Sequence, residues 1–254
     1  MIRFHPSSLA ALMGDAKSID PALLDTDDLR KLYAKKSKTD DDKAILEPLW
    51  DRTLSAGAKT YLKAYAREFL FSYVSIFSSR ETKKGTQCEP DSIDLLNAVL
   101  FKRYTKNTER RQTALLSGEC DIYDPVDGTL DVKSCWSLDS FPLLSEDCHS
   151  SVYEWQGRGY MHLWNAPRHR VAFCMVDTPD DLRPDWESED IHKVREKHAP
   201  AMRVSMIEYQ RDMVLEAKML TRCEVAQQYL AQIVARFNAE HNIVPDWKKK
   251  FLET

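Results

Sequence analysis

The chain has 254 residues, of which 43% are hydrophobic and 30% charged, with a net charge of -4. This length and hydrophobic content suit one large domain, or one domain with helical additions, and no apolar run is long enough to span a bilayer, so we expect a soluble intracellular protein. The negative balance excludes a general attraction to nucleic acid, so any such contact must come from local basic patches.

The N-terminal part of the chain is predicted to be helical. Ser7 and Ser8 precede the sequence LAALMG, a pattern typical of an N-cap that opens a short helix ending at Gly14. Residues 27–44 are polar and predict a mobile or loosely helical connection. Apolar residues then recur at helical spacing over residues 46–77.

Residues 85–104 predict a further amphipathic helix, with Pro90 in its first turn, where proline is tolerated. A β-hairpin follows. The elements predicted after it are a helix at 150–164, strands at 170–179 and 202–209, and a long helix at 213–239. This order predicts an α/β (α+β) fold in which a small mixed sheet is flanked by helices.

The hairpin is predicted from the stretch GECDIYDPVDGTLDVKSCWS, residues 118–137. Residues 115–123 would form the first strand and residues 129–136 the second. The cluster Asp-Pro-Val-Asp-Gly at 124–128 has the residue types that turns require.

The second strand of the hairpin carries the most informative side chains. Because side chains alternate along a strand, Asp131 and Lys133 should share one face, and we expect Val132 and Cys135 on the other. If Asp121 pairs nearby, two carboxylates repel each other unless a cation, either Lys133 or a divalent metal, lies between them. The residues alone also fit a solvated hairpin with one weak cross-strand ion pair.

Two charged stretches surround this region. Residues 101–111, FKRYTKNTERR, contain five Lys or Arg against one Glu, and residues 177–190 contain seven Asp or Glu against one Arg. A basic run is usually a solvated face, but this one directly precedes the acidic hairpin.

The six cysteines form no C-x-x-C pair, which argues against a zinc ribbon and against a clustered iron–sulfur ligand set. No histidine has another at i+4, so none is assigned to a metal. We expect reduced, mostly buried thiols.

Four short motifs follow one another in the chain: G-x-x-x-E at 85–89, G-E-C-D at 118–121, D-V-K at 131–133 and Q-G-R-G-Y at 156–160. This ordered set resembles the PD-(D/E)xK nuclease superfamily, and more narrowly the branch of phage lambda exonuclease and the RecB nuclease domain, with YqaJ-type viral recombinases. The N-terminal SSLAALMG is similar to the Ser-led helix that opens the viral recombinase exonucleases. The resemblance runs from about residue 3 to 178, with Cys120 where the superfamily's name has proline.

The resemblance implies a restriction-endonuclease-like core with helical N- and C-terminal additions. We therefore expect a single nuclease domain over residues 1–254. Its parts would be a helical segment at 1–80, the catalytic core at 85–178, and a strand and long helix at 200–254.

The resemblance also implies metal-dependent phosphodiester hydrolysis, with Mg²⁺ as the cofactor and Mn²⁺ as an alternative. The carboxylates of Asp121, Asp131 and Glu89 and the carbonyl of Val132 would hold the metal, because Mg²⁺ prefers oxygen ligands. Lys133 would orient or deprotonate the attacking water. The implied catalytic residues are Glu89, Asp121, Asp131, Lys133 and Gln156.

Several residues are candidates for DNA contacts. From the basic stretch these are Lys102, Arg103 and Lys106, which we expect to contribute to affinity but not to chemistry. Ser7 could contact a 5′-phosphate at a helix N-terminus, or be a plain N-cap. The remaining candidates each have a structural alternative: Trp136 as a packed hairpin end, Tyr160 as part of the core, and Gln156 as an exposed helix residue.

The implied function is a phage or prophage recombination exonuclease that degrades DNA from duplex ends and supplies single strands to an annealing protein in the bacterial cytoplasm. A homo-oligomer is compatible with this role. The alternatives are a structure-specific endonuclease and a non-catalytic DNA-binding protein on the same fold. The joint presence of Asp121, Asp131 and Lys133 argues against the last of these.

Overall fold

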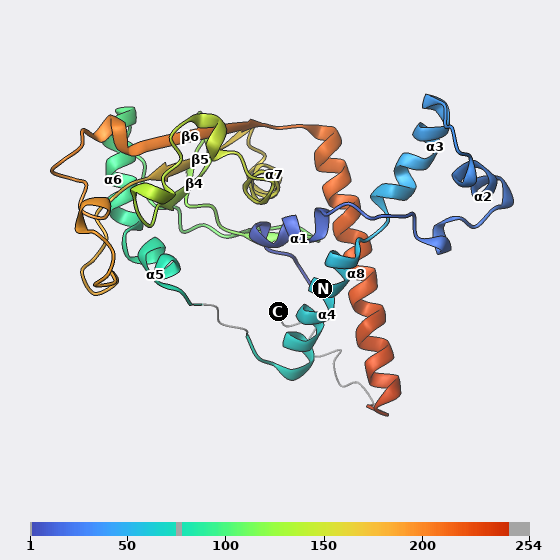
Figure 1. The fold of residues 1–254 in the computed structure, drawn as a ribbon. Coiled ribbons are helices and arrows are strands. Elements are labelled where there is room, and N and C mark those ends of the chain that lie inside the picture. Colours follow the sequence, from blue (N-terminus) through green and yellow to red (C-terminus); the bar gives the residue numbers. More distant parts are fainter. Residues whose placement is uncertain (1, 75–77, 244–254) are drawn as a thin grey trace. The chain divides into compact units, whose positions relative to one another are not determined.

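The computed structural model describes residues 2–74 and 78–243, which form two compact units. Unit 1 belongs to the segments 1–75 and 212–254, and unit 2 to the segment 76–211 (Figure 1). The last three residues of the predicted helical run 46–77 and the end of the 200–254 segment lie outside the described residues. No helix within the described ranges has the length and apolar character needed to cross a membrane. The prediction of one domain over the whole chain stays a prediction.

Unit 1 consists of helices: α1 (Leu9–Met13), α2 (Asp27–Ala34), α3 (Asp40–Asp51), α4 (Ala56–Phe71) and α8 (Met213–Glu240), with 3-10 turns at Pro6–Ser8 and Pro21–Leu23. The helices α1, α4 and α8 pack against one another. The buried Arg222 of α8 donates to the carbonyl oxygens of Leu12 and Asp51, which ties α1 and α3 to the long helix. The predicted helix before Gly14 and the long C-terminal helix are confirmed.

Residues 27–44 were predicted to form a mobile or loosely helical connection. In the structure, the two regular helices α2 and α3 cover most of this segment. Thr26 accepts a hydrogen bond from the N–H of Leu29, and Thr39 forms a capping box with Asp42. These caps satisfy backbone donors that a helix end otherwise leaves unpaired. The polar composition therefore reflects exposed helices rather than an unstructured connection.

Unit 2 contains the helices α5 (Arg80–Gln87), α6 (Glu89–Leu100) and α7 (Ser151–Trp164). Its strands are β1 (Arg111–Gln112), β2 (Ser117–Gly118), β3 (Ile122–Asp124), β4 (Gly128–Ser134), β5 (Arg168–Cys174) and β6 (Val204–Gln210). Four 3-10 turns lie at Leu138–Ser140, Ser145–Cys148, Glu189–Ile191 and Pro200–Arg203. The predicted single helix over 85–104 was wrong: the chain is divided at Cys88 into α5 and α6, and Pro90 lies in the first turn of the second of these.

The main sheet has the strand order β3-β4-β5-β6, in which β4 and β5 are parallel and the other two pairs antiparallel. Helix α7 connects the two parallel strands, as parallel pairing requires a crossover. The predicted mixed sheet flanked by helices is confirmed. The hairpin is confirmed as β3 and β4, but its first strand is interrupted, because β2 pairs with β1 instead.

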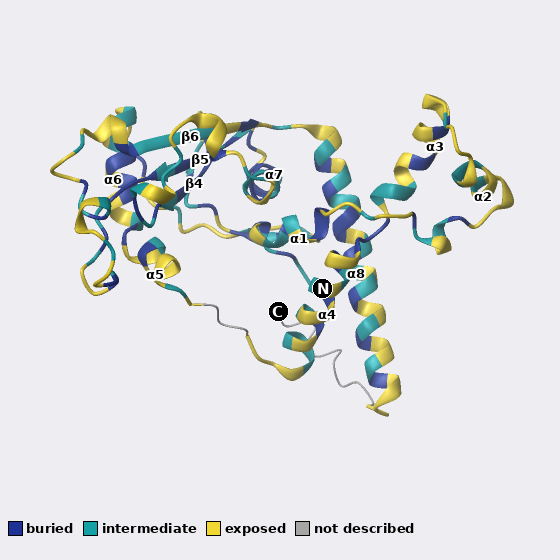
Figure 2. Cartoon of the chain, viewed as in Figure 1, coloured by how far each residue is buried: buried dark blue, intermediate teal, exposed yellow. Residues whose placement is uncertain are grey.

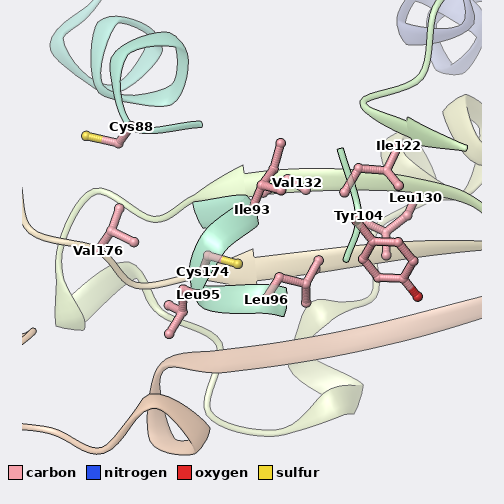
Figure 3. Close-up of a cluster of buried hydrophobic side chains, with 11 residues drawn as sticks. Cys88, Ile93, Leu95, Leu96, Tyr104, Ile122, Leu130, Val132, Cys174 and Val176 are labelled. Carbon is pink, nitrogen blue, oxygen red and sulfur yellow. The ribbon is translucent and has the colours of Figure 1, made fainter. Parts of the chain in front are cut away.

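The two faces of this sheet are covered by different helices. On one face, Ile93 and Leu96 of α6 pack with Leu130 and Val132 of β4 (Figure 3). On the other face, Tyr153 of α7 packs its ring against Phe173 of β5. Strand β4 is buried from its first residue to Val132 (Figure 2). The sheet core therefore fixes β4 from both sides.

The expectation that Cys135 shares a face with Val132 was wrong. Cys135 is buried in a separate cluster with Met175 and Phe173, whereas Val132 belongs to the α6-facing core. Residues 132 and 135 are an odd number of positions apart, so the alternation of a strand places them on opposite faces.

Candidate active site

Three carboxylates of unit 2 come together at the edge of β4. Glu89 is the first residue of α6, Asp121 directly precedes β3, and Asp131 lies in the middle of β4. The ammonium of Lys106 joins the first two, since it pairs with Glu89 Oε1 and lies 2.8 Å from Asp121 Oδ1. Segments far apart in sequence thus converge on one acidic cluster.

The backbone of β4 takes part in this cluster. The N–H of Val132 donates to Asp121 Oδ2 at 2.8 Å. In an extended strand the N–H and C=O of one residue point to the same edge, as paired strands show. The Val132 carbonyl, predicted as a metal ligand, therefore points to the edge where Asp121 lies.

Asp131 is almost fully buried, with 3% of its surface exposed. Its Oδ1 accepts from Gln156 Nε2 at 3.4 Å, and its Oδ2 forms an ion pair with Lys133. Apart from this ion pair, Oδ2 is a buried oxygen without a hydrogen-bond partner. A buried carboxylate oxygen is costly unless a cation or a donor satisfies it, and here the Lys133 ammonium is the neighbouring cation.

The proximity of these acids perturbs their ionisation. Burial raises the pKa of Asp131 to about 7, with Asp121 adding to the rise and Lys133 opposing it. Burial also raises the pKa of Glu89, although its hydrogen bond with Lys106 works in the other direction. Burial acts to raise the pKa of Asp121 as well, but the hydrogen bonds that Asp121 makes outweigh it and hold its pKa below the usual value. Burial, the charges of neighbouring acids and hydrogen bonds together produce this pattern.

The donor set fits a hard divalent cation. Three carboxylates and one strand carbonyl are oxygen ligands of the kind that Mg²⁺ prefers, and Asp131 Oδ2 is a buried acceptor that already lies against one cation, the Lys133 ammonium. Within residues 2–74 and 78–243, no three His, Cys, Asp or Glu side chains are already arranged to hold a metal ion. The ammonium groups of Lys106 and Lys133 lie against oxygens of the three carboxylates.

Helix α7 presents the Q-G-R-G-Y motif to this cluster. Gln156 is buried and joins Asp131 to the hydroxyl of Tyr160, which lies 3.5 Å from its Nε2. Tyr160 is 2% exposed and packs its ring against Trp164 and His169. The buried position of Tyr160 gives no support to a direct DNA contact, and the exposed-helix alternative for Gln156 was wrong.

The basic stretch does not act as one patch. Lys102 pairs with Asp127 of the hairpin turn at 2.7 Å, and Arg103 is exposed. Lys106 instead contacts two of the predicted catalytic acids. The expectation that Lys106 contributes to DNA affinity but not to chemistry stays a prediction, and the structure places its ammonium against these two acids. No sequence pattern distinguishes it from its neighbours.

The sequence also gave no sign of the role of Lys84. This α5 side chain is fully buried and donates to the carbonyls of Trp136 and Val176, at 2.9 Å each, and to Thr178 Oγ1 at 2.8 Å. The bonds tie α5, which precedes Glu89, to the ends of β4 and β5. Burial lowers the pKa of Lys84 to about 8.

Trp136 belongs to the same network. Its indole Nε1 donates to Glu187 Oε2 at 3.0 Å, and its ring packs edge-on against His192 with centroids 5.3 Å apart. These contacts match the packed hairpin end that was the alternative to base stacking.

Ser7 lies in unit 1, in the 3-10 turn before α1. Its hydroxyl is 2.8 Å from His5 Nδ1, and the adjacent Ser8, at the N-cap of α1, makes no side-chain cap hydrogen bond. The plain N-cap alternative for Ser7 was therefore wrong, and its phosphate contact stays a prediction.

No protein-family model and no curated protein matches this sequence. Solved structures do match. A phage-related exonuclease from Haemophilus somnus 129PT is 26% identical, with a TM-score of 0.75 over 93% of this chain and 96% of its own. The alkaline exonuclease LHK-Exo from Laribacter hongkongensis is 12% identical, with a TM-score of 0.58 over 94% and 93%. LHK-Exo in complex with dAMP gives 14% identity, a TM-score of 0.59 and the same coverage.

These neighbours confirm the resemblance to the viral recombinase branch of the PD-(D/E)xK nucleases. The likeness extends over nearly the full length of each chain, so it includes the helical segments as well as the core sheet. The motifs that predicted the resemblance lie on different elements of this fold, and they bring Glu89, Asp121 and Gln156 together beside Asp131 of β4.

Proposed function

We propose that this protein is a metal-dependent DNA nuclease, and specifically a phage or prophage recombination exonuclease that hydrolyses phosphodiester bonds from the ends of duplex DNA. The observation that carries the proposal is the convergence of Glu89, Asp121 and Asp131 at one strand edge beside Lys133. The similarity to a phage-related exonuclease over 93% of the chain supports the exonuclease class.

Mg²⁺, or Mn²⁺ as an alternative, would be held by the three carboxylates and the Val132 carbonyl. When bound, it would supply a more acidic water and charge stabilisation at the phosphate. The remaining tasks fall to the chain's own side chains.

Lys133 lies on the same strand face as Asp131, where its ammonium can orient the attacking water and offset the charge that grows on the phosphate. Gln156 fixes the Asp131 carboxylate from α7. A carboxylate held from two sides needs little reorganisation when the reaction begins, which is how preorganised sites lower barriers.

The substrate of this reaction is DNA, and exposed basic residues such as Arg103 would contact its backbone. We further propose that the single strand left after digestion passes to an annealing protein, and that the enzyme works in the bacterial cytoplasm. Ser7 remains the proposed contact for a 5′-phosphate.

A comparison of linear duplex with covalently closed circular duplex, each with Mg²⁺ or with EDTA, tests this function. We expect release of mononucleotides from the linear form only, and only with Mg²⁺. End-labelled linear duplexes with and without a 5′-phosphate would establish the polarity. Equal degradation of the circle would replace the exonuclease with the endonuclease alternative, and absence of cleavage from both would favour the DNA-binding alternative.

A further inference from the structure

Lys106 differs from the other basic residues of the 101–111 stretch in what its ammonium contacts. It donates to both Glu89 Oε1 and Asp121 Oδ1, whereas Lys102 pairs with Asp127 in the hairpin turn. Two oxygens from two different carboxylates therefore share one ammonium. This is the position that a bridging cation would take.

The backbone on both sides of Lys106 is fixed. Tyr104 is buried, and its N–H and C=O are bonded to the side chain of Asn97, at 2.7 and 2.9 Å. On the other side, the backbone N–H of Asn107 donates to the backbone carbonyl of Asp121 at 2.7 Å. The side-chain amide of Asn107 donates to the backbone carbonyl of Cys120 at 3.0 Å. These hydrogen bonds fix the backbone on both sides of Lys106, whose side chain lies against Glu89 and Asp121.

Lys106 and a divalent cation would compete for the same oxygens. Mg²⁺ binds oxygen at about 2.0–2.1 Å, so a metal on Asp121 Oδ1 would lie within a few ångströms of an ammonium 2.8 Å from that atom. Two cations so close repel each other strongly. The Lys106 side chain is 42% exposed, which leaves it room to withdraw toward solvent.

We propose that Lys106 is an internal counter-cation of the acidic cluster, which holds Glu89 and Asp121 together until a divalent metal displaces it. The inference rests on the proposed metal-dependent function. Lys106 lowers the affinity of the site for metal and stabilises the site without it. Lys106 is in this sense a positioning residue for the metal ligands.

Calorimetric titration with Mg²⁺ alone, without DNA, tests the proposal. Lys106→Met removes the charge at similar length, and we expect it to bind Mg²⁺ about tenfold more tightly than the parent. Lys102→Met, in the same stretch but paired with Asp127, is the matched control and should change the affinity less than about twofold. Lys106→Arg keeps the charge and should also stay within about twofold of the parent.

Thermal unfolding supplies a second readout. In EDTA, Lys106→Met should lower the Tm by about 2–4 °C, because Glu89 and Asp121 then repel each other without a counter-cation. Saturating Mg²⁺ should remove this difference from the parent. If Lys106→Met does not fold in EDTA, Lys106→Gln, which has no charge but retains an amide donor group, takes its place in both measurements.

Mg²⁺ affinity that is unchanged or weaker in Lys106→Met would overturn the counter-cation role while leaving the metal-dependent function intact. A parent protein that binds no Mg²⁺ would instead overturn the proposed function, and the role of Lys106 with it. The two failures are therefore distinguishable in one titration series.

Discussion

At the scale of single residues, Asp131 and Lys133 lie side by side on one face of β4, yet their proposed tasks differ. Asp131 is buried and would hold metal, whereas Lys133 keeps 29% of its side chain exposed and would act on the attacking water. The alternative interpretation of this pair is a purely structural salt bridge. Substitution of each residue distinguishes the catalytic roles from the structural one.

Lys133→Met should leave Mg²⁺ binding largely intact and lower the single-turnover cleavage rate by about a hundredfold or more, as for a lost general acid or base. Asp131→Asn should abolish both metal binding and cleavage. Calorimetry beside a quenched single-turnover assay measures the two losses. A Lys133→Met protein that cuts at the parent rate would reduce the pair to a structural ion pair.

Arg103 is an exposed residue of the basic stretch 101–111 and one of the proposed phosphate contacts. Arg103→Ala should weaken DNA binding and reduce the slope of log K against log salt by about one, because one phosphate contact is lost. Fluorescence anisotropy at several salt concentrations measures this slope. Unchanged binding would identify the residue as part of a solvated face.

At the scale of secondary structure, the site depends on how closely α7 approaches β5. A Cβ built on Gly157 would lie 2.3 Å from Cδ2 of His169, whose ring is fully buried and lies 2.9 Å from Thr129 Oγ1 at its Nδ1. Only glycine allows this approach without a shift of the helix. Gln156, which holds Asp131, is the adjacent residue of α7.

Gly157→Ala should therefore destabilise the fold by about 1–3 kcal/mol, the usual cost of overpacking a core, and should also slow cleavage by displacing Gln156. Gly85→Ala in α5 is the matched control, because no atom lies within 4 Å of its added Cβ. The control should be neutral or stabilise by up to about 1 kcal/mol. Urea unfolding compares the two, and equal stabilities would contradict the proposed close packing.

The elements that sequence predicted well are those with strong local signals. Turn residues at 124–128 marked the hairpin, and apolar periodicity marked α7 and α8. The break at Cys88 was missed because Pro90 is compatible with a helix start but does not demand one. The segment 27–44 was predicted as a mobile or loosely helical connection because its polar residues were interpreted as a connection. Capping residues such as Thr26 and Thr39 instead begin the regular helices α2 and α3.

At the scale of the whole molecule, the order of four motifs predicted the fold class, and solved structures confirm the resemblance. Pattern reasoning could not predict which charges meet. Lys106 joins carboxylates 17 and 15 positions away, and Lys84 bonds to groups 52 to 94 positions away. Such contacts depend on how α5, α6 and the sheet pack together. The positions of these lysines in the sequence carry no information about that packing.

The central claim is that the acids at the β4 edge form a metal-dependent nuclease centre, and the nucleotide release rate of Asp121→Asn tests it most directly. With linear duplex and saturating Mg²⁺, we expect the parent to release mononucleotides and Asp121→Asn to do so at least about a hundredfold more slowly. The parent in EDTA should be inactive. Release at the parent rate by Asp121→Asn, or by the parent in EDTA, would contradict the claim.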